Sequence, residues 1–360
     1  MMSEPLVSVV MVVCNVDRFL AESIESVLGQ TFKDFEFIII DFGSTDKSKA
    51  IALNYAARDA RIKLHEIPNF GLGEARNAGC FLAQGHYIAV MDADDVSTPD
   101  RLMSEFEFME KHPEVGLLGG YTEWIDETGR PLRIERFPTE DHEIRSALAT
   151  GCPFCQPTVL MRREAFVLVG GYRAAFVFAE DYDLWLRIAE HFPCANLRQV
   201  VLKYRSHPYQ VQIRKSRQQS LCILAALTSA SLRKAGKPDP FNSLKEITPA
   251  VLASMGVSEA KQQIFADLAW IRALYLSGDY SNALKSSIEA LRSADWECAE
   301  SWQIAETRLM VARLNWKKKR YASSILTAGH AFVSRPIMLG RPFKPLLRWF
   351  GWLKAANGGN

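Results

Sequence analysis

The stretch "FEFIIIDFGSTD", residues 35–46, places an apolar run directly before a carboxylate and a turn. Its isoleucines predict a buried strand, and Gly43-Ser44 predict the turn that follows. Asp-Phe-Gly also occurs in the metal-binding loop of protein kinases. We exclude that interpretation because no glycine-rich lid, strand lysine or His-Arg-Asp precedes this stretch. A strand that ends in Asp41 is instead typical of a ligand-binding edge in an α/β enzyme.

Apolar runs alternate with helix-like segments from about residue 5 to 205. The predicted strands lie at 6–13, 35–40, 62–67 and 87–91, and the predicted helices at 19–30, 46–58 and 73–83. Strands that are apolar throughout are typical of a parallel sheet covered by helices on both faces. We therefore predict an α/β, Rossmann-like domain with a mostly parallel sheet over residues 1–215, and we expect ligands beyond the carboxyl ends of its strands.

Beyond about residue 215 the alternation stops, and helical spacing continues without strand candidates. We predict an all-α region over residues 216–360, with Gly236–Pro240 as its linker. Residues 268–292 resemble a tetratricopeptide helix pair, and residues 319–332 are a weaker echo of it. Either a helix-pair appendage or a true repeat array fits this pattern.

The charge is distributed unevenly along the chain. The net charge is only +2, yet the chain after Glu306 holds no acidic residue and many Lys and Arg. Residues 334–354 mix these cations with Trp and Phe, which suits contact with an anionic membrane surface. The alternative is that the aromatic side chains pack back onto the helical region. Nucleic acid is not an expected partner, since the tail lacks a recognisable binding module.

Composition and targeting signals predict a cytoplasmic protein. The apolar fraction of 48% and charged fraction of 23% are those of a soluble globular chain. Seven cysteines without a regular framework argue against a disulfide-built secreted domain. The first apolar run is too short for a signal core, and no run is long enough to span a membrane. With the basic tail, this predicts a location at the inner face of the membrane.

Three acidic features stand at predicted strand or helix ends. Asp41 ends one strand, "MDADD" (91–95) follows another, and "EDYDLWLRI" (180–188) opens a helix. Asp-x-Asp after an apolar strand suits Mg²⁺ or Mn²⁺, because hard cations take carboxylate and phosphate oxygens. Alone the motif is weak, since Asp94-Asp95 could merely cap a helix that begins near Pro99.

The motifs taken together carry a resemblance. "SVVMVVCNVDRFLAESIESVLGQTFKDFEFIIIDFGSTDKS" is followed in order by "GLGEARNAG", "GHYIAVMDADDVSTPDRL", "QPTVLMRREAFVLVGGY" and "EDYDLWLRI". This series, over roughly residues 5–205, strongly resembles family 2 glycosyltransferases of the GT-A fold. Five separated motifs in the same order and spacing make the resemblance specific.

The resemblance implies a donor site. Asp41 matches the aspartate that faces the nucleobase of a nucleotide-sugar, and Arg76 stands where a basic residue lies near the diphosphate. Asp92 and Asp94 match the family's Asp-x-Asp, which contacts the ribose and a divalent cation, Mn²⁺ or Mg²⁺. We expect Asp94, with Asp92, to bind the metal. Arg76 could instead be an ordinary charge on a helix surface.

The resemblance also implies the catalytic base. Asp181 matches the carboxylate that removes a proton from the acceptor hydroxyl, and Glu180 is the second choice. Phe42 and Gln156 depart from the family pattern. Phe42 can stack on a base but cannot accept a hydrogen bond from it, and Gln156 stands where many relatives carry His.

The implied function is that of an inverting, metal-dependent glycosyltransferase of the hexosyltransferase type. It would move one sugar from a nucleotide-sugar, with a UDP-sugar expected, to a hydroxyl of a glycan or lipid-linked acceptor in cell-surface polysaccharide synthesis. The Gln-x-x-Arg-Trp signature of processive synthases is missing, which favours single transfer. Two alternatives stay open: a nucleotidyltransferase, and a non-catalytic GT-A-like scaffold whose helical region binds partners.

Overall fold

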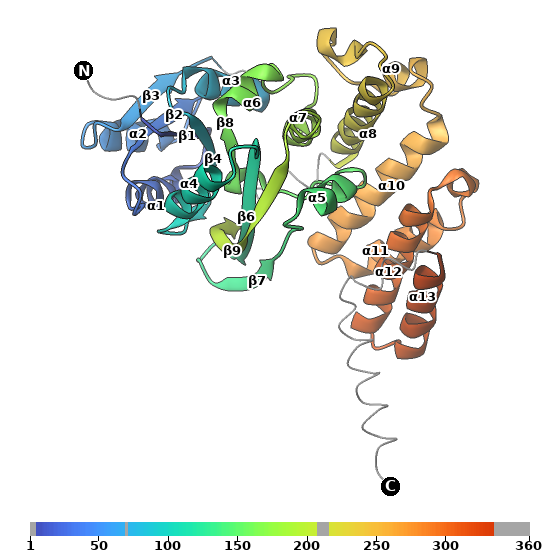
Figure 1. Ribbon diagram of the computed structural model, residues 1–360. Coiled ribbons are helices and arrows are strands. Elements are labelled where there is room, and N and C mark those ends of the chain that lie inside the picture. Colours follow the sequence, from blue (N-terminus) through green and yellow to red (C-terminus); the bar gives the residue numbers. More distant parts are fainter. Residues whose placement is uncertain (1–4, 69–70, 207–215, 335–360) are drawn as a thin grey trace. The chain divides into compact units, whose positions relative to one another are not determined.

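The computed structural model describes residues 5–68, 71–206 and 216–334 (Figure 1). Within them the chain forms two compact units. The first contains residues 5–206 and 225–246, and the second contains residues 216–224 and 247–334. The sequence analysis placed everything from residue 216 in the helical region, whereas residues 225–246 pack with the α/β unit. The predicted membrane contact of the basic tail, residues 335–354, lies outside the described residues.

Nine strands of the described chain form one sheet in the first unit, in the order β3-β2-β1-β4-β8-β6-β9-β5, with β7 beside β6. The strands are β1 (Val7–Val13), β2 (Phe35–Asp41), β3 (Ile62–Glu66), β4 (Tyr87–Asp92), β5 (Val96–Ser97), β6 (Leu117–Ile125), β7 (Pro131–Glu135), β8 (Leu160–Arg162) and β9 (Cys194–Arg205). The predicted α/β fold is therefore confirmed, with a sheet that is mixed rather than parallel throughout.

The first four strands are parallel, as the sequence predicts. β1 lies in the centre between β2 and β4, and β3 pairs with β2. Val13 is opposite Asp41 of β2, and Val12 is opposite Asp92 of β4. The two aspartates therefore flank the end of the same strand, at the carboxyl edge of the sheet.

Helices cover both faces of this part of the sheet. They are α1 (Asp17–Leu28), α2 (Ser48–Ala56), α3 (Leu72–Leu82) and α4 (Arg101–Lys111). Side chains of α1, α2 and α4 share one apolar core with alternate residues of β1, β2 and β4. α3 covers the other face, where its Gly79 lies against Val10 and Ile40. This close approach fixes the position of α3 relative to the carboxyl edge.

The other half of the sheet was not predicted strand by strand. β8 runs antiparallel to β4 and β6, whereas β9 runs parallel to β6. The register of β6 against β9 shifts twice around Tyr121, and β9 exposes Arg198 and Gln199 midway. An interrupted apolar pattern of this kind does not resemble a buried strand.

Four further helices lie before β9: α5 (Asp141–Leu148), the short 3-10 helix η1 (Gln156–Thr158), α6 (Arg163–Leu168) and α7 (Glu180–Ala189). After residue 215 all the described elements are helical, as predicted. These are α8 (Ser216–Lys234), η2 (Pro240–Ser243), α9 (Pro249–Ser254), α10 (Glu259–Leu276), α11 (Tyr280–Ala290), η3 (Ala294–Cys298), α12 (Ser301–Lys317) and α13 (Tyr321–Ser334).

The second unit has an apolar core of its own. Ile271 and Leu274 of α10, Leu284 of α11 and Leu314 of α12 are among its buried members. Asp279 accepts a hydrogen bond from the Asn282 amide and begins α11 after the turn at Gly278. A tetratricopeptide character of these helix pairs stays a prediction. In the described part of the chain, no helix is sufficiently long and apolar to cross a membrane.

Candidate active site

Asp41 ends β2 with one carboxylate oxygen engaged and one without a partner. Its Oδ1 accepts hydrogen bonds from the amides of Gly43 and Ser44, at 3.1 and 3.0 Å. Gly43 takes the left-handed φ of 99° that this turn requires. Asp41 is buried, yet its Oδ2 has no partner among the described residues. Because a buried carboxylate oxygen rarely lacks a hydrogen bond, this atom is suited to a ligand donor.

The Asp-x-Asp segment forms a tight turn between β4 and β5, with alternating burial. Asp92 and Asp94 are partly exposed, while Ala93 and Asp95 are buried. Arg205 of β9 holds this turn: its amide donates to Asp95 Oδ1 at 2.7 Å and its Nε to the Asp94 carbonyl at 2.8 Å. Two carboxylates on the open side of a fixed turn are a suitable arrangement for a hard cation.

The alternative that Asp94-Asp95 caps a helix is wrong. The following helix, α4, begins at Arg101, and no side chain caps it. The Arg101 amide instead donates to the Thr98 carbonyl at 3.1 Å. The acidic residues of the turn are therefore not needed to start this helix.

Arg76 of α3 is buried between Asp92 and Glu180 rather than exposed on a helix surface. Its exposed fraction is 7%, so the surface-charge alternative is wrong. One Nη donates to Asp92 Oδ1 at 3.1 Å and the other to Glu180 Oε1 at 2.5 Å. Burial alone would lower the pKa of Arg76, but the charges of Asp92 and Glu180 raise it above its ordinary value. Arg76 thus stays charged and connects β4 to the start of α7.

Glu180 and Asp181 open α7 and face different environments. Glu180 is buried and holds Arg76, which makes it a poor candidate for a freely acting base. Asp181 is partly exposed, and its Oδ1 accepts the Tyr182 amide at 2.7 Å. Burial, and next the charge of Glu180, raise the pKa of Asp181 to about 6. A carboxyl group with such a pKa suits proton abstraction near neutral pH.

We call Arg76, Asp92, Asp94, Glu180 and Asp181 the carboxyl-edge cluster, and their charges affect one another. Burial raises the pKa of Asp92; Arg76 opposes this rise, and the charge of Asp94 adds to it. The charges of Arg76 and Asp92 also act on Asp181. The residues at the end of β4 and at the start of α7 therefore form one site, and Asp41 lies at the same edge of the sheet.

Two polar residues of this region were not assigned a role from the sequence. Gln156 is buried and donates from Nε2 to the Tyr172 hydroxyl at 2.9 Å, while its Oε1 lacks a partner among the described residues. Tyr172 lies beside Arg76, whose guanidinium is 6.0 Å from the ring centroid. Gln156 had a signal in its departure from the family pattern, and Tyr172 is the last residue of the quoted motif that begins at Gln156.

The described side chains do not contain a group of three or more His, Cys, Asp or Glu that could hold a metal unaided. Asp92 and Asp94 offer two carboxylates at most, and one oxygen of Asp92 already accepts from Arg76. Such a sparse set fits a cation that keeps waters and takes its other ligands from substrate phosphates.

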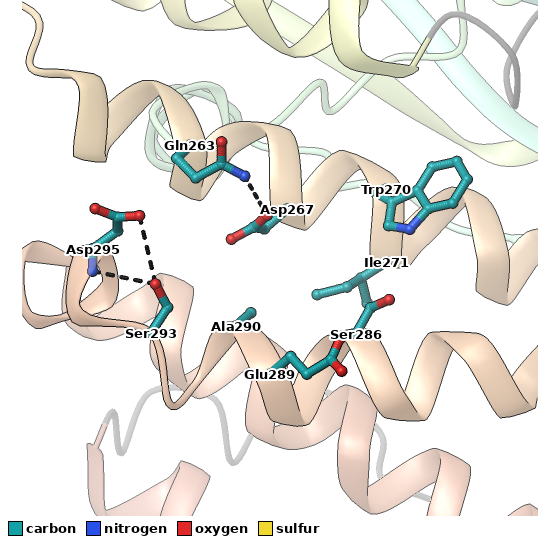
Figure 2. A pocket seen from close by; sticks show the side chains of 9 residues that line it. All are labelled: Gln263, Asp267, Trp270, Ile271, Ser286, Glu289, Ala290, Ser293 and Asp295. Carbon is teal, nitrogen blue, oxygen red and sulfur yellow. Dashed lines mark hydrogen bonds between the residues drawn. The ribbon is translucent and has the colours of Figure 1, made fainter.

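A separate concavity lies between α10 and α11 of the second unit. It has a volume of about 390 Å³ and is lined by Trp270, Asp267 and Glu289 among others (Figure 2). Asp267 is already engaged, since it accepts from Gln263 Nε2 at 2.8 Å and from Trp296 Nε1 at 2.9 Å. The pocket contains none of the carboxyl-edge residues, which remain the candidate active site.

Comparison with known proteins identifies a matching family model and similar sequences. Residues 8–168 match the family model "Glycosyl transferase family 2". EpsE of Bacillus subtilis is 41% identical over 211 residues, which are 57% of this chain and 74% of EpsE. The O-antigen biosynthesis glycosyltransferase WbnJ of Escherichia coli is 33% identical over 233 residues, 64% of this chain and 88% of WbnJ.

Two solved structures share the fold at low sequence identity. Residues 1–349 of S. aureus TarS, in complex with UDP-GlcNAc, align with a TM-score of 0.52 at 15% identity, over 94% of this chain and 93% of TarS 1–349. The mannosyltransferase PcManGT of Pyrobaculum calidifontis, in complex with GDP-Man and Mn²⁺, aligns with a TM-score of 0.53 at 16% identity, over 94% and 87%. With the family model and the close relatives, the carboxyl-edge site leads to one assignment: the chain belongs to glycosyltransferase family 2.

Proposed function

We propose that this protein is an inverting, metal-dependent hexosyltransferase. It transfers one sugar from a nucleotide-sugar to a hydroxyl of a glycan or lipid-linked acceptor in polysaccharide synthesis. The observation that carries the proposal is the carboxyl-edge cluster, in which Arg76 joins Asp92 to Glu180 beside Asp181, whose pKa is about 6. Relatives such as WbnJ, which is named for O-antigen biosynthesis, support the polysaccharide context.

The donor binds across the ends of β2 and β4. Asp41 Oδ2 is buried without a partner among the described residues and accepts an N–H of the nucleobase. Phe42, partly exposed beside it, stacks on the base. Asp92 contacts the ribose, and Arg76 keeps its carboxylate in place near the diphosphate. We propose uridine as the base, because the structural neighbour TarS binds UDP-GlcNAc, although PcManGT binds GDP-Man.

A divalent cation, Mn²⁺ or Mg²⁺, fits the turn that carries Asp94 and Asp92. When bound, it neutralises charge on the departing nucleoside diphosphate. The neighbour PcManGT contains Mn²⁺ together with its sugar donor, which supports this cofactor. Arg205 contributes by fixing the Asp94-Asp95 backbone, and this fixation keeps the two carboxylates on the open side of the turn.

Asp181 acts as the general base. Its carboxylate takes the proton of the acceptor hydroxyl while that oxygen forms a bond to the anomeric carbon. The bond from the anomeric carbon to the diphosphate oxygen breaks in the same displacement, and the nucleoside diphosphate leaves. One displacement inverts the anomeric centre. Glu180 does not share this role in our proposal, because its carboxylate is occupied by Arg76.

A panel of nucleotide-sugars tests the donor site. With Mn²⁺, we expect one donor to raise the melting temperature of the wild-type protein by several degrees. Asp94→Ala should lose the Mn²⁺-dependent part of this rise, and Asp41→Ala should reduce the preference for one base. Asp59→Asn, which changes a carboxylate in the loop between α2 and β3, serves as the control and should respond like the wild type. No response to any donor would favour a non-catalytic scaffold.

The basic tail extends the proposal to a membrane surface. We retain the prediction that residues 334–354 contact anionic lipid at the cytoplasmic face, where lipid-linked acceptors would be found. Flotation with anionic vesicles should carry the full chain but not a chain that stops at Ser334. Equal flotation of both would end this part of the proposal.

A further inference from the structure

A buried charged cluster outside the carboxyl edge connects three segments of the first unit. We call Arg173, Asp183, Ser229 and Asp239 the Arg173 clamp. Arg173 lies in the loop between α6 and α7, Asp183 lies in α7, and Ser229 and Asp239 belong to residues 225–246. All four side chains are largely buried. Ser229 and Asp183 are fully buried, and the side chains of Arg173 and Asp239 have exposed fractions of 11% and 5%.

One end of the clamp holds the first turn of α7. Arg173 donates from Nε to Asp183 Oδ2 at 2.9 Å and from Nη2 to Asp183 Oδ1. Arg187, one turn further along α7, donates from Nε to the same Oδ2 at 3.0 Å. Asp183 is fully buried and only two residues from Asp181, so its fixation limits movement of the candidate base.

The other end is Asp239, which the sequence analysis had placed in a linker. Asp239 Oδ2 accepts from Arg173 Nη1 at 2.9 Å, from Ser229 Oγ at 2.6 Å and from Arg233 Nη1 at 2.6 Å. Although burial acts to raise its pKa, the hydrogen bonds from Ser229 and Arg233 and the charge of Arg173 lower it to about 2. This stretch is therefore a charged attachment to the α/β unit, and the linker prediction is wrong.

The loop that carries Arg173 needs such support. Phe178, just before α7, has a φ of 67°, which costs free energy for a residue with a side chain. Packing assists the clamp: Phe176 contacts Phe241 with a centroid distance of 5.6 Å, and the Arg173 guanidinium lies 4.4 Å from the Phe176 ring. Asp239 and Phe241, which hold this loop from one side, thus follow it by more than sixty positions.

We infer that Asp239 is a positioning residue for catalysis: through Arg173 and Asp183 it fixes the first turn of α7 and thereby the place of Asp181. Residues 225–246, which lie beyond the segment that matches the family model, complete the catalytic unit. The inference about the clamp rests on geometry alone, and its catalytic consequence rests on the proposed function.

Hydrogen exchange of the full chain tests the clamp without any substrate. Asp239→Asn keeps the size of the side chain and removes the charge that pairs with Arg173. We expect the backbone of residues 170–186 to exchange at least threefold faster, while β2 and β4 stay as in the wild type. Asp59→Asn, which removes the ion pair with Arg61, is the matched control and should leave residues 170–186 unchanged. Unchanged exchange of residues 170–186 in Asp239→Asn would overturn the inference.

Kinetics test the catalytic consequence. With a donor identified, Asp239→Asn should lower kcat about tenfold and leave the donor Kd within twofold, because the donor-binding residues lie at the ends of β2 and β4. Asp239→Glu, which restores the charge, should recover part of the loss. An unchanged kcat with faster exchange would refute the catalytic role of Asp239.

Two further outcomes are informative. If Asp239→Asn does not fold, Ser229→Ala is the second variant: it removes the hydrogen bonds of Ser229 Oγ with Asp239, Arg173 and Arg233 but keeps the ion pair between Arg173 and Asp239. It should give a smaller change of exchange in the same segment, and no change would contradict the inference. If the wild-type protein turns over no donor, the proposed function fails, while the exchange experiment still decides whether the clamp fixes α7.

Discussion

At the scale of single residues, the raised pKa of Asp181 lowers the free energy of unfolding of the protein near neutral pH. Asp181 has a pKa of about 6 in the folded chain, above its ordinary value of 3.8. For an acid, such a rise means that ionisation opposes folding. The cost is fully present above about pH 6, shrinks as the pH falls, and vanishes below about pH 3.8.

Asp181→Asn should therefore raise the melting temperature at pH 7.5, and this gain should fade as the pH falls below 6. Asp59→Asn is the matched comparison with the opposite sign, since the hydrogen bond from Arg61 lowers the pKa of Asp59. That variant should be less stable than the wild type at pH 7.5 and approach it in acid. Thermal denaturation across this pH range measures both; a lower melting temperature for Asp181→Asn at pH 7.5 would contradict the account.

Single residues also show which parts of the candidate site could be predicted from the sequence. Asp41 and Asp92 could be placed because each follows an apolar run that can only be a buried strand. The ion pair between Arg76 and Glu180 could not, because it joins residues 104 positions apart and neither local pattern names its partner. Nor could the sequence indicate that the buried arginine pairs with Glu180 rather than with Asp181.

At the scale of elements, the site depends on how closely α3 lies on the sheet. A Cβ added at Gly79 would lie 2.5 Å from Val10 Cγ1 and 3.1 Å from Ile40 Cγ1. Gly79→Ala should therefore destabilise the protein by about 1–3 kcal/mol through overpacking. It should also displace Arg76, one turn earlier in the helix.

Gly73→Ala is a control on the same helix. Its Cβ would meet Glu180 Cβ at an ordinary 3.7 Å, so helix propensity should make this change neutral or stabilising by up to about 1 kcal/mol. Urea unfolding compares the two variants. Equal stability of Gly79→Ala and the wild type would mean that α3 is not tightly packed on β1 and β2.

Elements differ in how well the sequence reveals them. β1 and β2 are buried along their whole length, and their uniform apolar runs made them evident. β7 is exposed at four of its five residues, and β9 alternates irregularly, so tertiary pairing rather than local pattern makes them strands. The parallel half of the sheet, which bears Asp41 and Asp92, was therefore predictable, and the mixed half was not.

At the scale of the whole molecule, the α/β unit is not continuous in sequence. Residues 225–246 come after residues 216–224 of the second unit but pack with the α/β unit. Asp239 pairs with Arg173 of that unit, and Arg233 donates to Glu190 at 2.6 Å. Composition could not reveal this return, because a glycine- and proline-containing stretch resembles a linker whether or not its charges are paired. The described helices of the second unit form an apolar core of their own.

The central claim is that the carboxyl edge of the sheet catalyses sugar transfer with Asp181 as the base. The most direct test is the release of nucleoside diphosphate from the identified donor, with acceptor and Mn²⁺, as a function of pH. For the wild type we predict kcat/KM to fall below about pH 6 as Asp181 is protonated, and for Asp181→Asn a loss of about 10²–10⁴-fold with donor affinity retained. Turnover by Asp181→Asn at the wild-type rate would contradict the claim.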